Sequence, residues 1–337
     1  MNPLPTIAIP LAACIICAGL IVLLRPLLAR YALARPNARS SHTIPTPQGG
    51  GAAVIVAVIA SVAISVFLFD VMNVSSLFAI FAAAVLLALV GAYDDLRTMP
   101  VLPRLLMQAI AVGVVLATLP AEFHLVPALP VWVERSLLLI GGLWFVNLVN
   151  FMDGLDWITV AEAVPVTAAL ALFGFFGELS PGTTIVALAL CGAMIGFAPF
   201  NKPVAKLFLG DVGSLPIGLL MGWCLLQLAG HGHLLAALLL PLYYLADATI
   251  TLFRRLMKGE AVWIAHRSHF YQQATNNGFS VTQVVGEVFI LNLVLAAFAT
   301  VTIWIKSPYV QGMTLVLGLS AVALVLSRFS RQREPLP

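Results

Sequence analysis

The sequence is poor in charge. Only 9% of its 337 residues are Asp, Glu, Lys or Arg, and 61% are hydrophobic, whereas a soluble domain carries roughly 25% charged residues. No segment between the apolar runs is long enough to fold as a soluble domain, so we expect one membrane domain over residues 1–337. Apolar and polar residues do not alternate, which excludes a porin-like barrel. The expected fold class is therefore all-α, a polytopic bundle of membrane helices.

The sequence has few cysteines, and none of them lies in a polar segment. The four cysteines lie inside apolar runs, where a thiol behaves as a small hydrophobic group: Cys14, Cys17, Cys191 and Cys224. We interpret them as packing residues, in preference to a redox pair at Cys14 and Cys17. The N-terminal Met-Asn-Pro-Leu-Pro lacks the basic residues of a signal peptide. The first apolar run is therefore expected to remain as a membrane span.

The apolar runs give the number of expected helices. Eleven candidate membrane helices lie near residues 6–24, 51–69, 74–92, 105–119, 136–152, 162–177, 183–200, 214–230, 234–252, 284–305 and 310–327. Several are shorter than the roughly 20 residues of an upright span. All but two of the 17 lysines and arginines fall on one side of this bundle, and Arg135 and Lys306 fall on the other. The positive-inside rule then places the N-terminus outside and the C-terminus in the cytoplasm.

The most informative stretch closes the run that ends near residue 152. It reads Asn147-Leu-Val-Asn150-Phe-Met-Asp153-Gly-Leu-Asp156, and in a helix its first three polar residues would share one broad face. An ionisable group at bilayer depth costs about 2.5–3.5 kcal/mol on insertion scales, so such a cluster indicates function. Oxygen-rich side chains without a nearby cysteine suit a hard cation such as Mg²⁺, which usually binds together with phosphate. The alternative is an ordinary polar helix end.

Two more clusters of carboxylates fall on the expected cytoplasmic face. Asp94 and Asp95 end the third run, where neighbouring carboxylates repel each other and favour a bound cation or a raised pKa. Asp211 is flanked by glycines and precedes Ser214, as in a phosphate or metal corner at a helix N-terminus. A solvated helix end and a simple N-cap are the alternatives. We favour function because several such clusters share one face.

Basic residues reach the same face in two loops. The first loop joins Arg39-Ser-Ser-His42 to a run of three glycines at 49–51, which would let the backbone approach an anion or would simply begin a helix. The longest loop contains His266-Arg267-Ser268-His269. Zinc is discounted there because no cysteine or third ligand lies nearby. Beside a phosphate site these side chains would stabilise negative charge, and contact with lipid headgroups is the alternative.

Four motifs, taken in order, resemble those of the polyprenyl-phosphate N-acetylhexosamine-1-phosphate transferase superfamily: Tyr93-Asp94-Asp95-Leu, Asn147-x-x-Asn150-x-x-Asp153-Gly-x-Asp156, Leu209-Gly210-Asp211-x-Gly213-Ser214 and His266-x-x-His269. The resemblance covers nearly the whole chain. The short His-Arg-Ser-His sequence and eleven spans are closer to the O-antigen-initiating branch than to phospho-MurNAc-pentapeptide translocase. The chain departs from that branch at Gln48, where arginine is frequent, and at Trp157, where glycine is commoner.

The resemblance implies a reaction and its ligands. An N-acetylhexosamine 1-phosphate would pass from a UDP-sugar to undecaprenyl phosphate with release of UMP, which initiates synthesis of an O-antigen-like, lipopolysaccharide-type envelope polysaccharide. The cofactor would be Mg²⁺, for which Mn²⁺ can substitute. The enzyme would lie in the bacterial inner membrane with its site on the cytoplasmic face. Membrane lipid is an expected partner and nucleic acid is not.

The same resemblance assigns roles to residues of this sequence. Asn150 and Asp211 would hold the metal. The residues implied to be catalytic are Asp94, Asp95, Asp153, His266 and His269. The residues implied to bind substrate are Asn147, Asp156, Arg267, His42 and Arg104. Either Asp94 or Asp95 would position the lipid phosphate or take a proton from it.

Other functions compatible with the composition remain as alternatives. A proton-coupled transporter should carry its polar groups near the midplane and show an inverted repeat, and neither is seen in the sequence. Another Mg²⁺-dependent enzyme acting on lipid phosphate would use the same residues, and only an assay for UMP separates the two. The donor sugar, the pathway, the polyprenyl groove and a homodimeric state are left open by the sequence.

Overall fold

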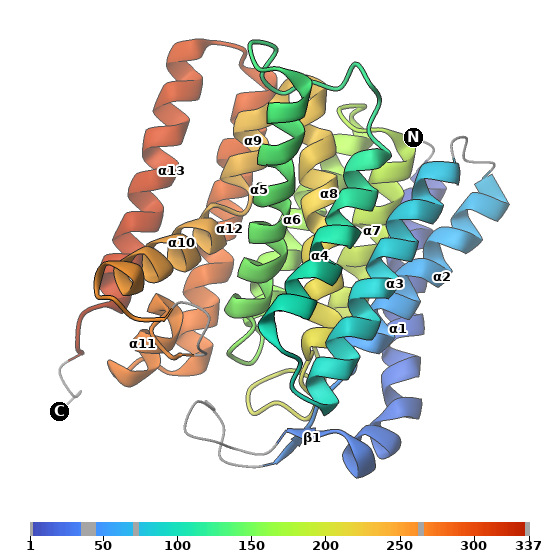
Figure 1. Cartoon of the computed structure of the whole chain (residues 1–337), viewed down its shortest axis with the longest axis vertical. Helices are drawn as coiled ribbons and strands as arrows, with labels where there is room; N and C mark the ends of the chain where they lie inside the picture. The colour runs from blue at the N-terminus through green and yellow to red at the C-terminus, as the bar shows by residue number, and fades with distance from the viewer. Residues whose placement is uncertain (1–2, 35–44, 70–73, 262–265, 334–337) are drawn as a thin grey trace.

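The computed structural model describes residues 3–34, 45–69, 74–261 and 266–333. Figure 1 shows a bundle of long helices that run roughly parallel to one another, with shorter elements at the lower end. The helices that precede residue 240 are α1 (Pro3–Tyr31), α2 (Gly50–Phe69), α3 (Val74–Leu96), α4 (Val101–Ala117), α5 (Val131–Met152), α6 (Ile158–Phe175), α7 (Pro181–Phe197), α8 (Asp211–Leu228), the π-turn η1 (Ala229–His233) and α9 (Leu234–Leu239). Those that follow are α10 (Leu242–Met257), α11 (Phe270–Asn276), α12 (Val281–Trp304) and α13 (Pro308–Phe329).

The membrane character expected from the sequence is confirmed. Within the described residues, eight helices are long and apolar enough to cross a membrane, and α4 and α7 are apolar helices of 17 residues each. Helix α1 begins at the top of Figure 1 and α13 ends at the bottom, as an odd number of crossings requires. The total of eleven crossings and the outward N-terminus stay predictions.

One expected helix is divided. The run 234–252 forms α9 and α10, which are separated at Leu240 and Pro241. Pro241 has no N–H to continue the hydrogen bonding of α9, and its backbone angles are not helical. Helix α10 consequently starts in a new direction and lies obliquely across the lower part of the bundle (Figure 1).

Helices α6, α7 and α8 form the centre of the bundle. Most of their residues are buried, whereas α1 and α13 are mostly exposed and are therefore available to lipid. The centre is packed with leucine, alanine and valine, so its cohesion comes from close contact between side chains. This rigid centre holds the N-terminus of α8, where Asp211 begins the helix.

Glycines allow three helices to meet at that point. A Cβ added to Gly51 on α2 would overlap the backbone of Gly213 on α8, and one added to Gly91 on α3 would overlap the carbonyl of Asp211. The glycine run at the start of α2 therefore permits close helix packing. A two-stranded ribbon of β1 (Leu33–Ala34) and β2 (Thr46–Pro47) leads into this contact.

Candidate active site

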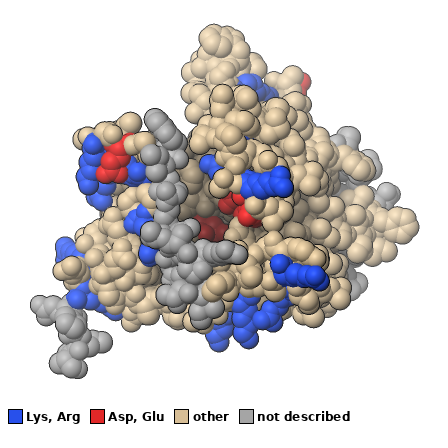
Figure 2. Space-filling model, turned by 60° about the horizontal axis from the view of Figure 1, so that its bottom comes forward, with Lys and Arg blue, Asp and Glu red and all other residues tan. Residues whose placement is uncertain are grey.

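The lower end of the bundle is hollowed. Figure 2 shows acidic side chains deep in this hollow and basic side chains distributed around its rim. Four carboxylates predicted from separate motifs come from the ends of three helices: Asp94 and Asp95 from α3, Asp153 after α5, and Asp211 from α8. Such an arrangement attracts cations to the floor and anionic ligands to the rim.

Asp95 is held by the first turn of α8. One of its oxygens accepts hydrogen bonds from the backbone N–H of Asp211 (2.9 Å) and from the Gln48 side chain, and the other accepts from the N–H of Val212 (3.1 Å). Asp95 thus caps α8 from another helix, because Gly210 at the N-cap has no side chain to do so. Both of its oxygens are engaged in positioning the helix that carries Asp211.

Asp94 is oriented differently. One oxygen accepts from the backbone N–H of Met99 (2.6 Å), and the other forms an ion pair with Arg104 on α4 (2.8 Å). The Asp94 and Asp211 side chains also lie within hydrogen-bonding reach of each other. Two carboxyl groups at that separation share a proton or a cation, because both cannot stay ionised there without compensation.

Asp211 is hydrogen-bonded to the side-chain amide of Asn150. The Asn150 Nδ2 atom donates to the carboxylate of Asp211 (2.8 Å) and to the hydroxyl of Ser214 (2.9 Å). The predicted pair of metal ligands is therefore brought together, although 61 positions separate the two residues in the sequence. The amide oxygen of Asn150 is the atom left to serve as a ligand.

Asp153 follows the last turn of α5 and is enclosed by the surrounding helices. Burial raises the pKa of its carboxyl to about 8, and the negative charges of Asp211, Asp95 and Asp156 act in the same direction. A hydrogen bond from the Thr159 hydroxyl opposes the shift. Near neutral pH this group therefore holds a proton that it would release when a cation or a more polar ligand enters the hollow.

Two predicted substrate-binding residues form hydrogen bonds within the chain. Asn147 is buried and donates to Gln108 on α4 (2.7 Å) and to the carbonyl of Leu143 (2.8 Å). Asp156 accepts a hydrogen bond from the N–H of Ala205 (2.9 Å). It thereby ties the end of its motif to the loop that leads towards Asp211. His42 lies outside the described residues.

The histidine motif lies in the segment before α11. The rings of His266 and His269 are stacked with their centroids 4.9 Å apart, and His269 is 2% exposed. The Nδ1 atom of His266 contacts both the hydroxyl (2.8 Å) and the backbone N–H (3.4 Å) of Ser268. Arg267 lies between the two histidines in sequence. The predicted motif is thus an ordered pair of imidazoles.

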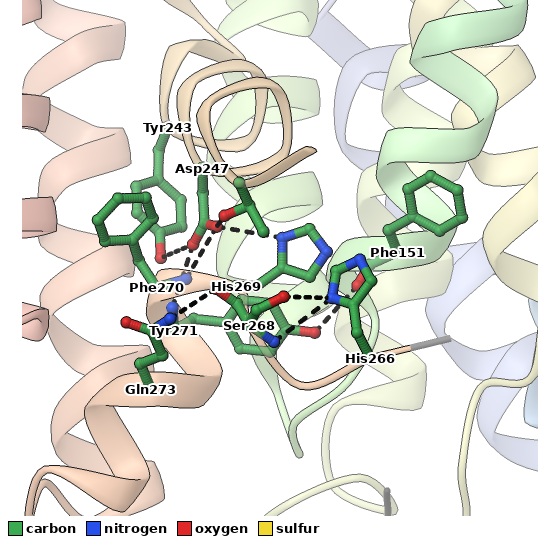
Figure 3. A network of polar contacts seen from close by, with 10 residues as sticks. Phe151, Tyr243, Asp247, His266, Ser268, His269, Phe270, Tyr271 and Gln273 are labelled. Carbon is green, nitrogen blue, oxygen red and sulfur yellow. Dashed lines mark hydrogen bonds and ion pairs between the residues drawn. The ribbon is translucent and has the colours of Figure 1, made fainter. Parts of the chain in front are cut away.

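Asp247 is a residue that the motif reading missed. It lies on α10 with 0% exposure, and its carboxylate binds the start of α11 and the ring of His269 (Figure 3). The signal was present in the sequence, because Asp247 is an ionisable residue inside the run 234–252, and such residues indicate function by default.

The donor set agrees with a hard cation. Among the described residues, no group of three or more His, Cys, Asp or Glu is arranged to hold a metal by itself. Asp211 supplies a carboxylate, and the amide of Asn150, whose nitrogen contacts that carboxylate, also carries an oxygen. Mg²⁺ is usually held by one or two carboxylates with the remaining positions filled by water and substrate phosphates. The residues therefore fit a cation that shares its ligands with a substrate.

Comparison with known proteins finds similar proteins along most of the chain. Residues 77–229 match the model of glycosyl transferase family 4, and this range includes all four clustered aspartates. A probable undecaprenyl-phosphate N-acetylglucosaminyl 1-phosphate transferase of Bacillus subtilis is 24% identical over 310 residues, which span 85% of this chain and 84% of the relative. A decaprenyl-phosphate N-acetylglucosaminephosphotransferase of Mycobacterium leprae is 26% identical over 339 residues, which span 88% and 84%. The corresponding protein of Mycobacterium tuberculosis is 25% identical over 346 residues, spanning 90% and 85%.

The relatives match most of the chain, and the family model covers the four clustered aspartates. Residues 77–229 are thus similar to glycosyl transferase family 4, and most of the chain is similar to polyprenyl-phosphate N-acetylglucosamine-1-phosphate transferases.

Proposed function

We propose that this protein transfers an N-acetylhexosamine 1-phosphate from a UDP-sugar to undecaprenyl phosphate and releases UMP. The B. subtilis relative is named for an undecaprenyl-phosphate acceptor, and all three relatives are named for N-acetylglucosamine. UDP-N-acetylglucosamine is therefore the first donor to test. An oxygen of the lipid phosphate attacks the phosphorus that carries the sugar, the bond from that phosphorus to UMP breaks, and UMP leaves with the bonding electrons.

The observation that carries the proposal is the meeting of four carboxylates and one amide at the ends of three helices. A transporter would place such groups near the midplane, whereas Asp94, Asp153 and Asp211 lie at one end of the bundle. Donor and acceptor are both anionic, so their approach requires compensating positive charge. Mg²⁺, or Mn²⁺ in its place, would supply that charge when held by Asp211 and Asn150.

The contacts suggest separate roles for the two adjacent aspartates. Asp95 maintains the first turn of α8, and so acts on the position of Asp211. Asp94 is oriented by Arg104 and is the better candidate to position the lipid phosphate. A base is not required for the attack, since a phosphate with a second pKa near 6 is already largely dianionic at neutral pH.

The remaining predicted residues would organise the donor. Asp153 would arrange the metal or donor from the floor of the hollow, and Asp156 would act near the uridine through the loop that it anchors. His266, His269 and Arg267 would hold the donor phosphates, since imidazole and guanidinium groups donate hydrogen bonds to anions. Asn147, His42 and Arg104 complete the proposed substrate-binding set.

The setting of the reaction follows the same proposal. The enzyme would work as a single domain in the bacterial inner membrane with its hollow facing the cytoplasm, where UDP-sugars are found. Its product would begin an envelope polysaccharide of the O-antigen type. A homodimer is compatible with the exposed apolar faces of α1 and α13, although the same faces suit lipid.

The test is release of UMP by purified protein in detergent with undecaprenyl phosphate, Mg²⁺ and a panel of UDP-N-acetylhexosamines. Release that requires both the lipid and the metal is expected, and the preferred donor would identify the sugar. Release without the lipid would indicate a hydrolase. If no donor reacts, calorimetric measurement of the binding of each UDP-sugar distinguishes an absent transfer step from an absent donor site, and failure of both measurements contradicts the proposal.

A further inference from the structure

A single carboxylate inside α10 collects five hydrogen bonds. Asp247 accepts from Tyr243 (3.2 Å) and Thr251 (3.2 Å) on its own helix. It also accepts from the Nδ1 of His269 (3.2 Å) and from the backbone N–H groups of Phe270 (3.0 Å) and Tyr271 (3.1 Å). Figure 3 shows His269 with Asp247 on one side and His266 on the other. Because this carboxylate is fully buried and accepts so many hydrogen bonds, its position is well defined.

We propose that Asp247 is a positioning residue for the histidine motif, one that fixes the tautomer of His269 and the place of both histidines relative to Asp153. The proposal rests on the function proposed above, in which these histidines bind the donor phosphates. It goes further by naming a residue that acts through them and makes no contact with the substrate itself.

A residue that served only to cap α11 would need only the hydrogen bonds to the backbone of that helix. Helix α11 begins at Phe270, and the side chain of its N-cap residue, His269, does not bond to its first turn. Asp247 supplies the missing acceptors to Phe270 and Tyr271 from another helix. The third contact, to the His269 ring, adds nothing to the cap. It determines how the imidazole is oriented.

The hydrogen-bond partners assign a different tautomer to each neutral ring. A backbone N–H can only donate, so the Nδ1 of His266 accepts from Ser268 and the ring proton lies on Nε2. The Nδ1 of His269 faces a carboxylate, which can only accept while ionised, so this nitrogen carries the proton. His266 therefore offers a donor at Nε2, and a neutral His269 offers an acceptor there, so in this tautomer His269 would act on the phosphates through the His266 ring that stacks on it.

The same element is tied to the carboxylate motif. The hydroxyl of Tyr271 donates to the carbonyl of Phe151 (3.0 Å), within the motif that ends α5. A Cβ on Gly154 would overlap that hydroxyl and would lie 2.9 Å from the Nε2 of Gln272. Tyr271 thus bonds to Asp247 at its backbone and to Phe151 at its side chain, which sets the spacing between the histidines and Asp153.

Helix α10 also binds the residues that follow its own C-terminus. The guanidinium of Arg255 binds the carboxylate of Glu260 (2.8 Å) and the carbonyl of Ala261 (3.2 Å). Arg255 lies eight positions after Asp247 on the same helix, so α10 binds described residues both before and after the two histidines. The histidines are consequently located by α10, even though they are not part of it.

Asp247→Asn is the decisive variant. An amide keeps the shape of the carboxylate but has an N–H₂ group where one acceptor stood. With that group towards His269, the ring proton is expected to move from Nδ1 to Nε2. The KM for the UDP-sugar is expected to rise roughly 10- to 100-fold, as when the partner that orients a metal-binding histidine is removed. The reason is that the His269 ring loses the charged partner that fixes its position, and with it the position of His266, whose Nε2 is the donor to the phosphates. The KM for undecaprenyl phosphate should stay within about twofold, because the variant leaves uniform binding of the lipid intact.

The readouts are ¹⁵N NMR of histidine-labelled protein in detergent, both KM values and thermal unfolding. His269 is assigned from the signal lost in His269→Gln. Thr251→Val is the matched control, since it removes one hydrogen bond from the same carboxylate without contacting the histidine segment. It should leave the tautomer and both KM values near those of the wild type. Tyr271→Phe should raise the donor KM while keeping the tautomer.

Each result supports or overturns the proposal. A His269 that carries its proton on Nε2 in the wild type overturns it, and this measurement remains possible if Asp247→Asn does not fold. A folded Asp247→Asn with unchanged tautomer and donor KM also overturns it. If the wild type releases no UMP, the proposed function fails separately, and the tautomer in the wild type and variant still decides whether Asp247 positions the ring.

Discussion

The proposed site is made of two parts that are built in different ways. The carboxylates Asp94, Asp153 and Asp211 stand at the ends of helices that pack in the bundle, so their positions follow from the packing of α3, α5 and α8. The histidines stand outside those helices, and Asp247 on α10 holds His269 and the start of α11. The first part lies inside the family match over residues 77–229, and the second lies beyond it.

This difference suggests that the two parts contribute to different steps of the reaction. A group fixed by helix packing is suited to chemistry that tolerates little displacement, because preorganised charge needs no rearrangement during the reaction. A segment that is held by a few hydrogen bonds can change its position while the helix bundle stays intact. We therefore expect changes in the carboxylates to act on turnover or folding, and changes in the histidine segment to act on binding of the donor.

The largest effect is expected from Asp211→Asn. Removal of this charge should lower turnover by about 1000-fold or more, since it removes a proposed metal ligand from a site whose chemistry depends on charge compensation. The protein should remain folded, because the amide can keep the contact with Asn150. UMP release and thermal unfolding measure the two effects. Turnover at the wild-type rate by pure variant would contradict the metal assignment.

His266→Ala tests the histidine segment, the second of the two parts. The donor KM should rise roughly 10- to 100-fold with a smaller change in turnover, because a donor of hydrogen bonds to the phosphates is lost and the carboxylates are retained. The measurement is steady-state UMP release at varied UDP-sugar. A fall in turnover as large as that of Asp211→Asn, with unchanged KM, would remove the distinction between the two parts.

Asp95→Ala should reduce both stability and turnover. Two backbone N–H groups of α8 lose a charged acceptor, which corresponds to about 2–3 kcal/mol of unfolding free energy. Turnover should fall as well, since Asp211 begins the same helix. Asp94→Asn serves for comparison and should lose turnover with little change in unfolding temperature. Equal unfolding temperatures for both variants would show that Asp95 does not support α8.

Gly51→Ala examines the glycine run at the start of α2. The added Cβ would overlap the backbone of Gly213, so we expect a loss of about 1–3 kcal/mol from overpacking and a lower unfolding temperature. Gly113→Ala on α4 is the matched control, because its Cβ meets nothing within 4 Å. A stable Gly51→Ala that has lost only donor binding would instead favour an anion-binding role for this run.

The remaining prediction concerns Asp153 and pH. Its pKa is raised from 3.8 to about 8 in the folded protein, so between these values the folded state keeps a proton that the unfolded state has lost. This group therefore lowers stability progressively as pH rises from about 4 to 8. Asp153→Asn in chelator should unfold a few degrees higher than the wild type at pH 8 and near the same temperature at pH 4. An advantage that is the same at both pH values would contradict the shift.

Several parts of the structure could be read directly from residues. Ten of the predicted runs became single helices because long apolar segments must satisfy their backbone hydrogen bonds within themselves. The division of 234–252 was indicated by Pro241, but the prediction relied on hydropathy alone. The convergence of Asp94, Asp153 and Asp211 was expected from their common face. The partners of Asp95 were not, because a cap supplied by another helix leaves no local pattern.

The sequence by itself determined that this is a helical membrane protein whose polar motifs gather at one end, because apolar length and the positions of ionisable residues are local properties. Only the tertiary structure decided which carboxylate faces the hollow, which one holds a helix, and how Asp247 reaches a histidine 22 positions away. Those assignments depend on hydrogen bonds between distant segments, and such bonds are set by the packing of helices.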